Sequence, residues 1–264
     1  MTLLVAWTGA DYKKGGNKIS SLYLASDSRI SWGKANAYDH YQKVYGSNKY
    51  PDLFGFCGDV TFPTHILSQL ISQIDNNLLF KDCDNADLKH AKVFAIVEKQ
   101  LSLYPVEQKQ KFTILHASRH NGEFKLFQID YNNICRTQEI ILSNESKVVF
   151  AGGSGGSSFT DNLLRWKDDR HNNKGTTRGV YHCLIETLER LNDFSVGKSI
   201  QLIGLYRINN ARIIGTTINN QRYLFGKEVE HSELYDNIEW RNEKFERISS
   251  SDLKLLEGAQ IQPF

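Results

Sequence analysis

The order of elements in this 264-residue chain predicts an α+β fold, a four-layer αββα sandwich with two antiparallel sheets between two pairs of helices. Two observations carry this prediction. Pairs of β-rich runs alternate with pairs of runs at helical spacing, and hydrophobic residues make up 40% of the chain, enough for a sizeable core. We expect one domain over residues 1–220 and a polar C-terminal extension over residues 221–264 packed on its outside.

The first half of the chain supplies strands and then a pair of helices. Runs rich in β-branched and aromatic residues predict four strands, over 2–8, 20–26, 43–45 and 53–57. Apolar residues at helical spacing predict a first helix that begins near Phe62-Pro63. In a second helix, the residues expected to face the core are Leu88, Ala91, Ala95, Val97 and Leu101.

The second half repeats this order. β-Rich runs predict strands over 112–117, 124–129 and 147–150. Helical patterns follow over 159–166 and 176–191, after the glycine-rich stretch AGGSGGSS. The domain is expected to end with strands over 199–206 and 212–217, and from residue 221 onward we expect only short elements.

Composition excludes several classes of function. The 32 basic and 30 acidic residues leave a net charge of +2, so we expect no nucleic-acid partner. The four cysteines and eight histidines lack the spacing of metal ligands, and no dinucleotide or phosphate-loop motif is complete, so neither a metal nor an organic cofactor is expected. No run approaches the length of a membrane span, and the first residues lack the features of a signal peptide. We expect a cytoplasmic protein without a membrane partner.

The stretch LASDSRISWG puts a carboxylate, Asp27, at the end of an apolar strand. An unpaired buried carboxylate is costly, so Asp27 needs a partner. Lys43 lies 16 residues further on, at the start of the next candidate strand, and we expect Asp27 to face it beneath the N-terminus. The alternatives are that Asp27 caps a turn with Ser28 and that Lys43 is a solvated strand end.

Thr2 adds a nucleophile to this pair. Removal of Met1 would leave a threonine that carries both a hydroxyl and a free α-amine, which titrates near pH 7.7–8 and can accept the hydroxyl proton. A lysine beside the threonine lowers the pKa of that amine, and a carboxylate holds the lysine in place. Thr2, Asp27 and Lys43 therefore predict a nucleophile that carries its own general base.

Further motifs accompany these residues: the Met-Thr start, LASDSR, GFCGD over 55–59, FTILHASRHNGEFKLFQID, and AGGSGGSS before a helix. In this order, and over roughly residues 2–217, they resemble the proteasome β-type peptidases of the N-terminal-nucleophile (Ntn) hydrolase superfamily. The chain is most similar to the bacterial relatives, the heat-shock peptidase that works with an AAA+ unfoldase and the Anbu group.

The resemblance implies roles for the residues that match the family's motifs. Thr2 matches the N-terminal nucleophile, and Asp27 and Lys43 match the pair that tunes and positions it. Gly58 matches the glycine whose backbone N–H forms the oxyanion hole, where a donor stabilises charge that develops on the scissile carbonyl.

A second group of matches concerns the amine of the nucleophile. Ser154 matches the serine that hydrogen-bonds this amine, and Asp193 matches the aspartate that supports the serine. The family has another serine shortly after this aspartate. Without a gap Val196 occupies that position, and with a shift of one residue Ser195 does.

The family pattern also implies a first specificity pocket. Its lining would be Ile30, Tyr41, Tyr45, Phe56 and Val60. All five are apolar or aromatic, so an apolar side chain before the scissile bond fits better than a charged one. The same bulk would alternatively fill the pocket and leave room only for small residues.

The resemblance implies a self-compartmentalising threonine peptidase that acts on a peptide or polypeptide, assembles as a homo-oligomer and works with an AAA+ unfoldase. Two other functions stay open. A silent proteasome-like subunit would serve as a scaffold or binding module if Met1 stays attached. A small-molecule amidase of the same superfamily would use the same nucleophile on an acyl-amide.

Overall fold

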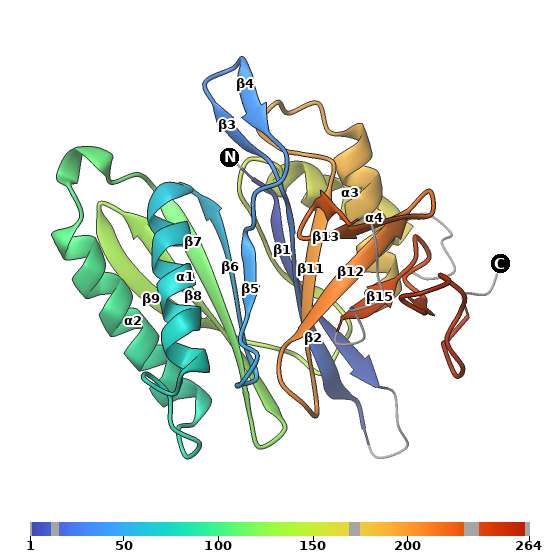
Figure 1. The fold of residues 1–264 in the computed structure, drawn as a ribbon, viewed down its shortest axis with the longest axis horizontal. Helices are drawn as coiled ribbons and strands as arrows, with labels where there is room; N and C mark the ends of the chain where they lie inside the picture. The colour runs from blue at the N-terminus through green and yellow to red at the C-terminus, as the bar shows by residue number, and fades with distance from the viewer. Residues whose placement is uncertain (1, 12–15, 169–174, 230–237, 262–264) are drawn as a thin grey trace.

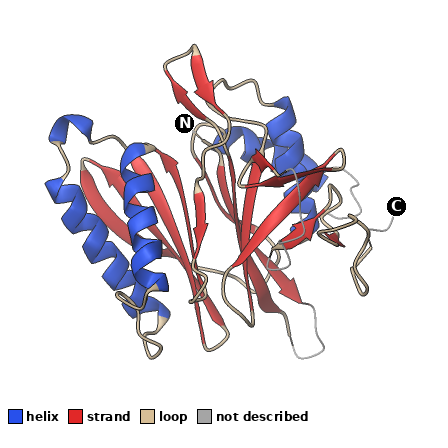
Figure 2. Cartoon of the chain, viewed as in Figure 1, coloured by secondary structure: helices blue, strands red, loops and turns tan. Residues whose placement is uncertain are grey.

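The computed structural model describes residues 2–11, 16–168, 175–229 and 238–261. These residues form a nine-stranded sheet (the larger sheet), a five-stranded sheet (the smaller sheet), a two-stranded hairpin and four α-helices (Figure 1). The two sheets pack against each other. Figure 2 shows how their strands fill the middle of the molecule.

The larger sheet begins and ends with distant parts of the chain. Its order is β10-β1-β2-β11-β12-β13-β14, all antiparallel, while β15 pairs in parallel with β12, and β16 pairs with β15. Its strands are β1 (Leu4–Asp11), β2 (Lys18–Asp27), β10 (Val148–Gly152), β11 (Ile200–Tyr206), β12 (Arg212–Ile218), β13 (Gln221–Leu224), β14 (Lys227–Glu228), β15 (Glu239–Arg241) and β16 (Arg247–Ile248).

The smaller sheet is an antiparallel meander in the order β5-β6-β7-β8-β9. Its strands are β5 (Val44–Gly46), β6 (Asp52–Gly58), β7 (Phe112–His120), β8 (Glu123–Asn132) and β9 (Ile134–Ile140). A separate hairpin, β3 (Ile30–Trp32) with β4 (Asn36–Tyr38), projects beyond both sheets near the start of the chain (Figure 1).

The helices are amphipathic and each pair packs on one sheet. They are α1 (Thr61–Asp75), α2 (Ala86–Leu103), α3 (Gly156–Asp168) and α4 (Thr177–Arg190), with a 3₁₀ turn over Val106–Gln108. The Asn85 side chain accepts a hydrogen bond from Leu88 N–H and caps α2, and the Thr176 side chain caps α4 in the same way.

Buried apolar side chains of the described residues form three clusters, because side chains alternate between the two faces of a strand. Leu4 and Leu24 point between the sheets and meet Leu115 of the smaller sheet. Their neighbours on β1 and β2 point the other way, toward α3 and α4. The third cluster lies between the smaller sheet and the helices α1 and α2.

The core-facing side of α2 differs from the prediction. Leu88, Ala91 and Ala95 are exposed, whereas Lys89 and His90 are buried together with Val97 and Leu101. The helix is therefore rotated relative to the predicted orientation. The reason is that Lys89 and His90 have hydrogen-bond partners on the smaller sheet, which helical spacing alone does not reveal.

The predicted fold class, an α+β four-layer αββα sandwich, is wrong. The protein is β-rich: of the residues that the structure describes, 37% are in strands and 25% in helices, and the sheets are mostly antiparallel. The prediction omitted β3, β4 and β9, and where β13–β16 lie it expected only unspecified short elements. The face of the larger sheet that α3 and α4 cover is shared by Phe245 of the C-terminal segment, which packs against Tyr23 and Tyr181.

Candidate active site

Three fully buried polar side chains meet where β1, β2 and β5 begin or end. Thr2 precedes β1, Asp27 ends β2, and Lys43 immediately precedes β5; none of them is exposed to solvent. Lys43 Nζ donates to Thr2 Oγ1 over 2.9 Å and to Asp27 Oδ1 over 3.0 Å. The structure thus brings together the three residues predicted to carry the chemistry.

The Asp27 carboxylate has three further donors, all backbone N–H groups. Leu3 N–H reaches Oδ1 over 2.9 Å, and Arg29 and Gly197 N–H reach Oδ2 over 2.9 and 2.8 Å. With Lys43 this gives the carboxylate four hydrogen bonds, which compensate its burial. Asp27 is therefore held rigidly and fixes the position of Lys43 Nζ under Thr2.

Burial lowers the pKa of Lys43, and Asp27 only partly opposes this effect. The backbone around the lysine is also fixed: Lys43 N–H donates over 2.9 Å to the side-chain oxygen of Gln201, whose amide group donates in turn to the Asp27 carbonyl oxygen. A lysine with a lowered pKa, in contact with a hydroxyl, is an arrangement that tunes proton transfer at that hydroxyl.

Gly58 ends β6 at a point where only glycine fits. Its φ is +95°, and a Cβ there would lie 2.5 Å from the Lys111 carbonyl oxygen. Phe56 N–H donates to the Lys43 carbonyl oxygen over 3.2 Å. Successive N–H groups point to alternate edges of a strand, so the N–H groups of Phe56 and Gly58 point to the same edge of β6. This edge faces β5 and Lys43.

The glycine-rich turn after β10 contacts the backbone of Thr2. Gly155 N–H donates to the Thr2 carbonyl oxygen over 3.2 Å. Gly153 has a φ of +84°, and a Cβ on it would lie 2.0 Å from the same oxygen, so this approach requires glycine. Thr2 itself has a φ of +113°, which β-branched residues rarely adopt. Met1 lies outside the described residues.

Ser154, Ser195 and Asp193 form a hydrogen-bonded chain beside this turn. The two serine Oγ atoms are 3.0 Å apart, and Ser195 Oγ donates to Asp193 Oδ1 over 2.6 Å. Burial would raise the pKa of Asp193, but hydrogen bonds from both serines outweigh it and lower this pKa. Ser195 therefore takes the position for which two residues were considered, while Val196 is buried in the apolar cluster under α3 and α4.

Four of the five predicted specificity residues come together. Tyr45 and Phe56 belong to the cluster between the smaller sheet and its helices, and Tyr41 and Val60 pack against it. Burial raises the pKa of Tyr45 to about 12, so its hydroxyl stays protonated. Ile30 is buried at the start of β3 and is not a member of this cluster.

Sequence reasoning missed two residues that support the site, Gly197 and Gln201. Gly197 contributes only a backbone N–H to Asp27, and a backbone donor leaves no signal in a sequence. Gln201 is a buried amide within the otherwise apolar strand β11, and this break in the pattern could have drawn attention to it.

A bidentate ion pair links the hairpin to the site. Arg29 Nε lies 2.5 Å from Asp39 Oδ1, and its Nη2 donates to Oδ2 over 2.8 Å. The same guanidinium donates to the Phe194 carbonyl oxygen over 3.2 Å. Hydrogen bonding to Arg29 lowers the pKa of Asp39. This contact connects the base of β3 and β4 to the loop that carries Asp193 and Ser195.

A second buried lysine lies in the smaller-sheet cluster. Lys89 Nζ is 2.8 Å from Asp52 Oδ2, and His116 Nε2 is 3.1 Å from Oδ1. His116 Nδ1 is 3.2 Å from His90 Nδ1, and His90 Nε2 is 2.6 Å from Thr137 Oγ1. This network provides an internal comparison for the lysine–aspartate pair of Lys43 and Asp27.

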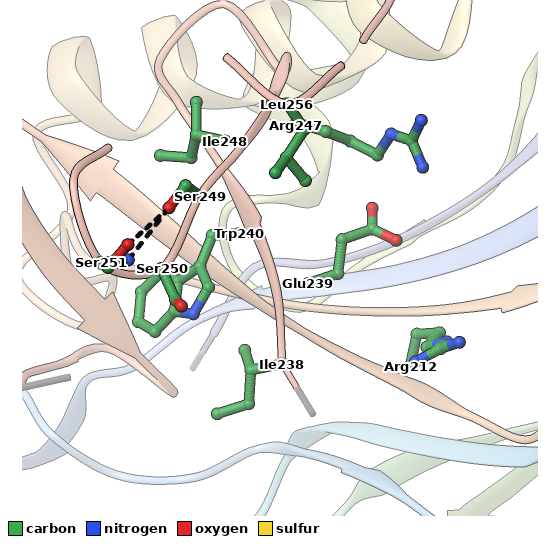
Figure 3. A pocket seen from close by; sticks show the side chains of 10 residues that line it. All are labelled: Arg212, Ile238, Glu239, Trp240, Arg247, Ile248, Ser249, Ser250, Ser251 and Leu256. Carbon is green, nitrogen blue, oxygen red and sulfur yellow. Dashed lines mark hydrogen bonds between the residues drawn. The ribbon is translucent and has the colours of Figure 1, made fainter. Parts of the chain in front are cut away.

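A hollow of about 600 Å³ lies in the C-terminal segment, lined by residues of β12, β15, β16 and the turn that follows (Figure 3). Arg212, Glu239 and Arg247 are among its lining, and Ser249 Oγ lies 2.9 Å from Ser251 Oγ. None of the predicted site residues lines it, so it is separate from the candidate active site.

No protein-family model matches the sequence, and a comparison with curated proteins found no significant similarity. The resemblance to proteasome β-type peptidases therefore stays a prediction from motifs. Across the described ranges, no three histidine, cysteine, aspartate or glutamate side chains gather in an arrangement suited to a metal ion. No helix in these ranges has the length and apolar character needed to cross a bilayer.

Proposed function

We propose that the protein is an N-terminal threonine hydrolase, a proteasome-like peptidase in which Thr2 becomes the nucleophile after the Met1–Thr2 bond is cut. One observation carries the proposal: Lys43 Nζ lies 2.9 Å from Thr2 Oγ1 and 3.0 Å from Asp27, with all three side chains fully buried. Burying a lysine–carboxylate pair rarely adds stability compared with apolar residues. A pair aimed at a hydroxyl therefore argues for chemistry there.

The reaction begins when the free amine of Thr2 takes the hydroxyl proton. Oγ1 then forms a bond to the carbonyl carbon of a peptide, and the oxyanion accepts a hydrogen bond from the N–H of Gly58. Lys43 disfavours a second positive charge on the amine, which keeps that amine a competent base near neutral pH. The C–N bond breaks as its nitrogen receives the proton from the amine, and water hydrolyses the resulting ester.

The supporting residues hold this arrangement in place. Ser154, Ser195 and Asp193 form a hydrogen-bonded chain on the turn that touches Thr2, which suits orientation of its amine. The apolar group of Tyr41, Tyr45, Phe56 and Val60 suits an apolar side chain before the scissile bond. With this activity we propose a cytoplasmic homo-oligomer that acts on peptides or polypeptides and receives its substrates from an AAA+ unfoldase.

Intact mass tests the proposal. Protein from its native host is weighed before and after treatment with an epoxyketone, which reacts with both the hydroxyl and the amine of an N-terminal threonine. We expect a chain that starts at Thr2 and gains one adduct. Thr2→Ala abolishes the adduct, whereas Thr8→Ala, which removes another buried hydroxyl on β1, keeps it. An adduct that survives Thr2→Ala contradicts the proposal.

A silent scaffold subunit is the second candidate, and the burial of Thr2 favours it. The Thr2 side chain has no exposed surface in the structure, so Oγ1 is not accessible to a substrate there. Retention of Met1 in native material, together with no adduct, selects this candidate. A third outcome, cleavage of small acyl-amides but not of unfolded polypeptides by a monomer or dimer, selects an amidase.

A further inference from the structure

A hollow of about 410 Å³ opens beside the proposed nucleophile, at the ends of β6, β7 and β8. Its lining includes a row of three side chains in register across these strands: Cys57 opposite Thr113, and Thr113 opposite Asp130. Residues paired across an antiparallel sheet project from the same face, so this row forms one continuous surface.

The row is continuous with Thr2 through Gly153, which also lines the hollow. A Cβ on Gly153 would lie 2.0 Å from the Thr2 carbonyl oxygen and 3.4 Å from the Cys57 Cβ. Gly153 therefore lies against both residues and connects the backbone of Thr2 to the rim of the hollow.

The row of Cys57, Thr113 and Asp130 lies on the face of the smaller sheet opposite to Phe56, whereas Phe112 and Tyr131 line the hollow from the face that carries Phe56. Phe56 packs in the cluster under α1 and α2, whereas its neighbour Cys57 packs between the sheets. Gly58, the proposed oxyanion donor, ends the strand between these two sides. A substrate whose carbonyl oxygen is bound by Gly58 has its acyl part on one side and its leaving group on the other. With the acyl part on the Phe56 side, the leaving group lies on the Cys57 side.

Asp130 is the ordered charge in this hollow. Its Oδ1 accepts a hydrogen bond from Thr113 Oγ1 and its Oδ2 one from Gln128 Nε2, both over 2.6 Å, which orient the half-buried carboxylate and leave lone pairs for a ligand. Lys111, the other charged lining residue, is exposed, so solvent screens its side chain. Two strand spacings, about 10 Å, separate the strands that carry Cys57 and Asp130. A ligand residue bound beside Cys57 therefore needs a long side chain to reach the Asp130 carboxylate.

We propose that this hollow binds the residue immediately after the scissile bond, and that Asp130 selects lysine or arginine there. The inference rests on the proposed function for the position of that bond. It assigns a specificity-determining role to a side chain on β8, outside the acyl-side pocket.

Matched peptides test this inference on the processed, full-length protein. Internally quenched peptides differ only in the residue after the scissile bond, which is lysine, norleucine or glutamate, and mass spectrometry verifies the cleavage point. Norleucine matches the length of lysine without its charge. We expect kcat/KM to be about tenfold higher for lysine than for norleucine, and lowest for glutamate. Asp130→Asn brings the lysine-to-norleucine ratio close to one.

Asp87→Asn is the matched control, because Asp87 is an exposed carboxylate on α2 paired with Lys125. This variant keeps the tenfold ratio. An equal ratio in wild type and Asp130→Asn, or no preference for lysine over norleucine in wild type, overturns the inference.

Two further measurements separate this inference from the proposed function. An aminocoumarin amide has no residue after the scissile bond, so failure to cleave both it and the peptides contradicts the proposed function alone. Calorimetry on Thr2→Ala then tests the hollow without catalysis, using Lys-Ala-Ala and norleucine-Ala-Ala amides. Tighter binding of the lysine peptide that is lost on adding Asp130→Asn supports the hollow as a basic subsite, and equal binding overturns it.

Discussion

Replacing Lys43 by methionine separates its chemical role from its structural one. Methionine has a similar length and fills the same buried space, but it donates no hydrogen bond to Thr2 Oγ1 or Asp27. The chain contains a matched control, because Lys89 is also buried and lies 2.8 Å from a buried aspartate, Asp52. Lys89→Met removes the same charge from a comparable pair.

The expected cost in stability is similar for the two variants. Removing one partner of a buried ion pair typically costs about 3–5 kcal/mol because the other charge is left unpaired. In Lys43→Met, Asp27 keeps its three backbone N–H donors, and in Lys89→Met, Asp52 keeps His116. Both variants therefore fall toward the lower end, about 3 kcal/mol.

The expected effect on activity differs. Loss of a preorganised charge at the reacting hydroxyl lowers kcat by about 10²–10³-fold, whereas Lys89→Met keeps the activity of each folded molecule. Urea unfolding measures the first quantity, and peptide hydrolysis with epoxyketone labelling rates measures the second. Equal activity losses in the two variants, once corrected for the folded fraction, would refute the role given to Lys43.

Two other variants test separate features. Gly58→Ala puts a Cβ 2.5 Å from the Lys111 carbonyl oxygen at a φ of +95°, so it should lower the free energy of unfolding in urea by about 1–3 kcal/mol and abolish hydrolysis. The control is Gly122→Ala, at a φ of +81° in open space, which should keep activity. A fully active Gly58→Ala would contradict the oxyanion assignment. Burial lowers the pKa of His90 to about 3, whereas histidine in the unfolded chain titrates near 6.5. Between these values only the unfolded chain binds this proton, so stability should fall by about 3 kcal/mol from pH 6.5 to 4, and His90→Gln should remove that part of the slope.

Much of the element order could be predicted from periodicity, yet the fold class could not. The long strands and helices carry strong apolar patterns, and they occur near their predicted ranges. The hairpin β3–β4 and the strands β13–β16 are two to four residues long, too short for alternation to be recognised. These short strands add to the β content and make the protein β-rich. In addition, Phe245 of the C-terminal segment packs over the larger sheet beside α3 and α4.

The site could be anticipated only where side chains follow strand ends. Asp27 ends an apolar strand and Lys43 immediately precedes another, β5, so the sequence suggests that they meet. Asp130 carries no such signal, because it lies on a strand whose register with β7 sets its neighbours. Lys89 and His90 were missed for the same reason. Their partners, Asp52 on β6 for Lys89 and His116 on β7 for His90, lie on strands distant in sequence, and helical spacing alone favoured the apolar Leu88.

The positive φ of Thr2 bears on the proposed cleavage of the Met1–Thr2 bond. A β-branched residue held at +113° stores about 1–3 kcal/mol of conformational energy, and the tight contacts of its carbonyl oxygen with Gly153 and Gly155 maintain it. A φ torsion exists only while a carbonyl carbon is bonded to the nitrogen of the residue. If the bond before Thr2 is cut as proposed, the torsion no longer exists and its energy is released, so the processed chain would be more relaxed than its precursor.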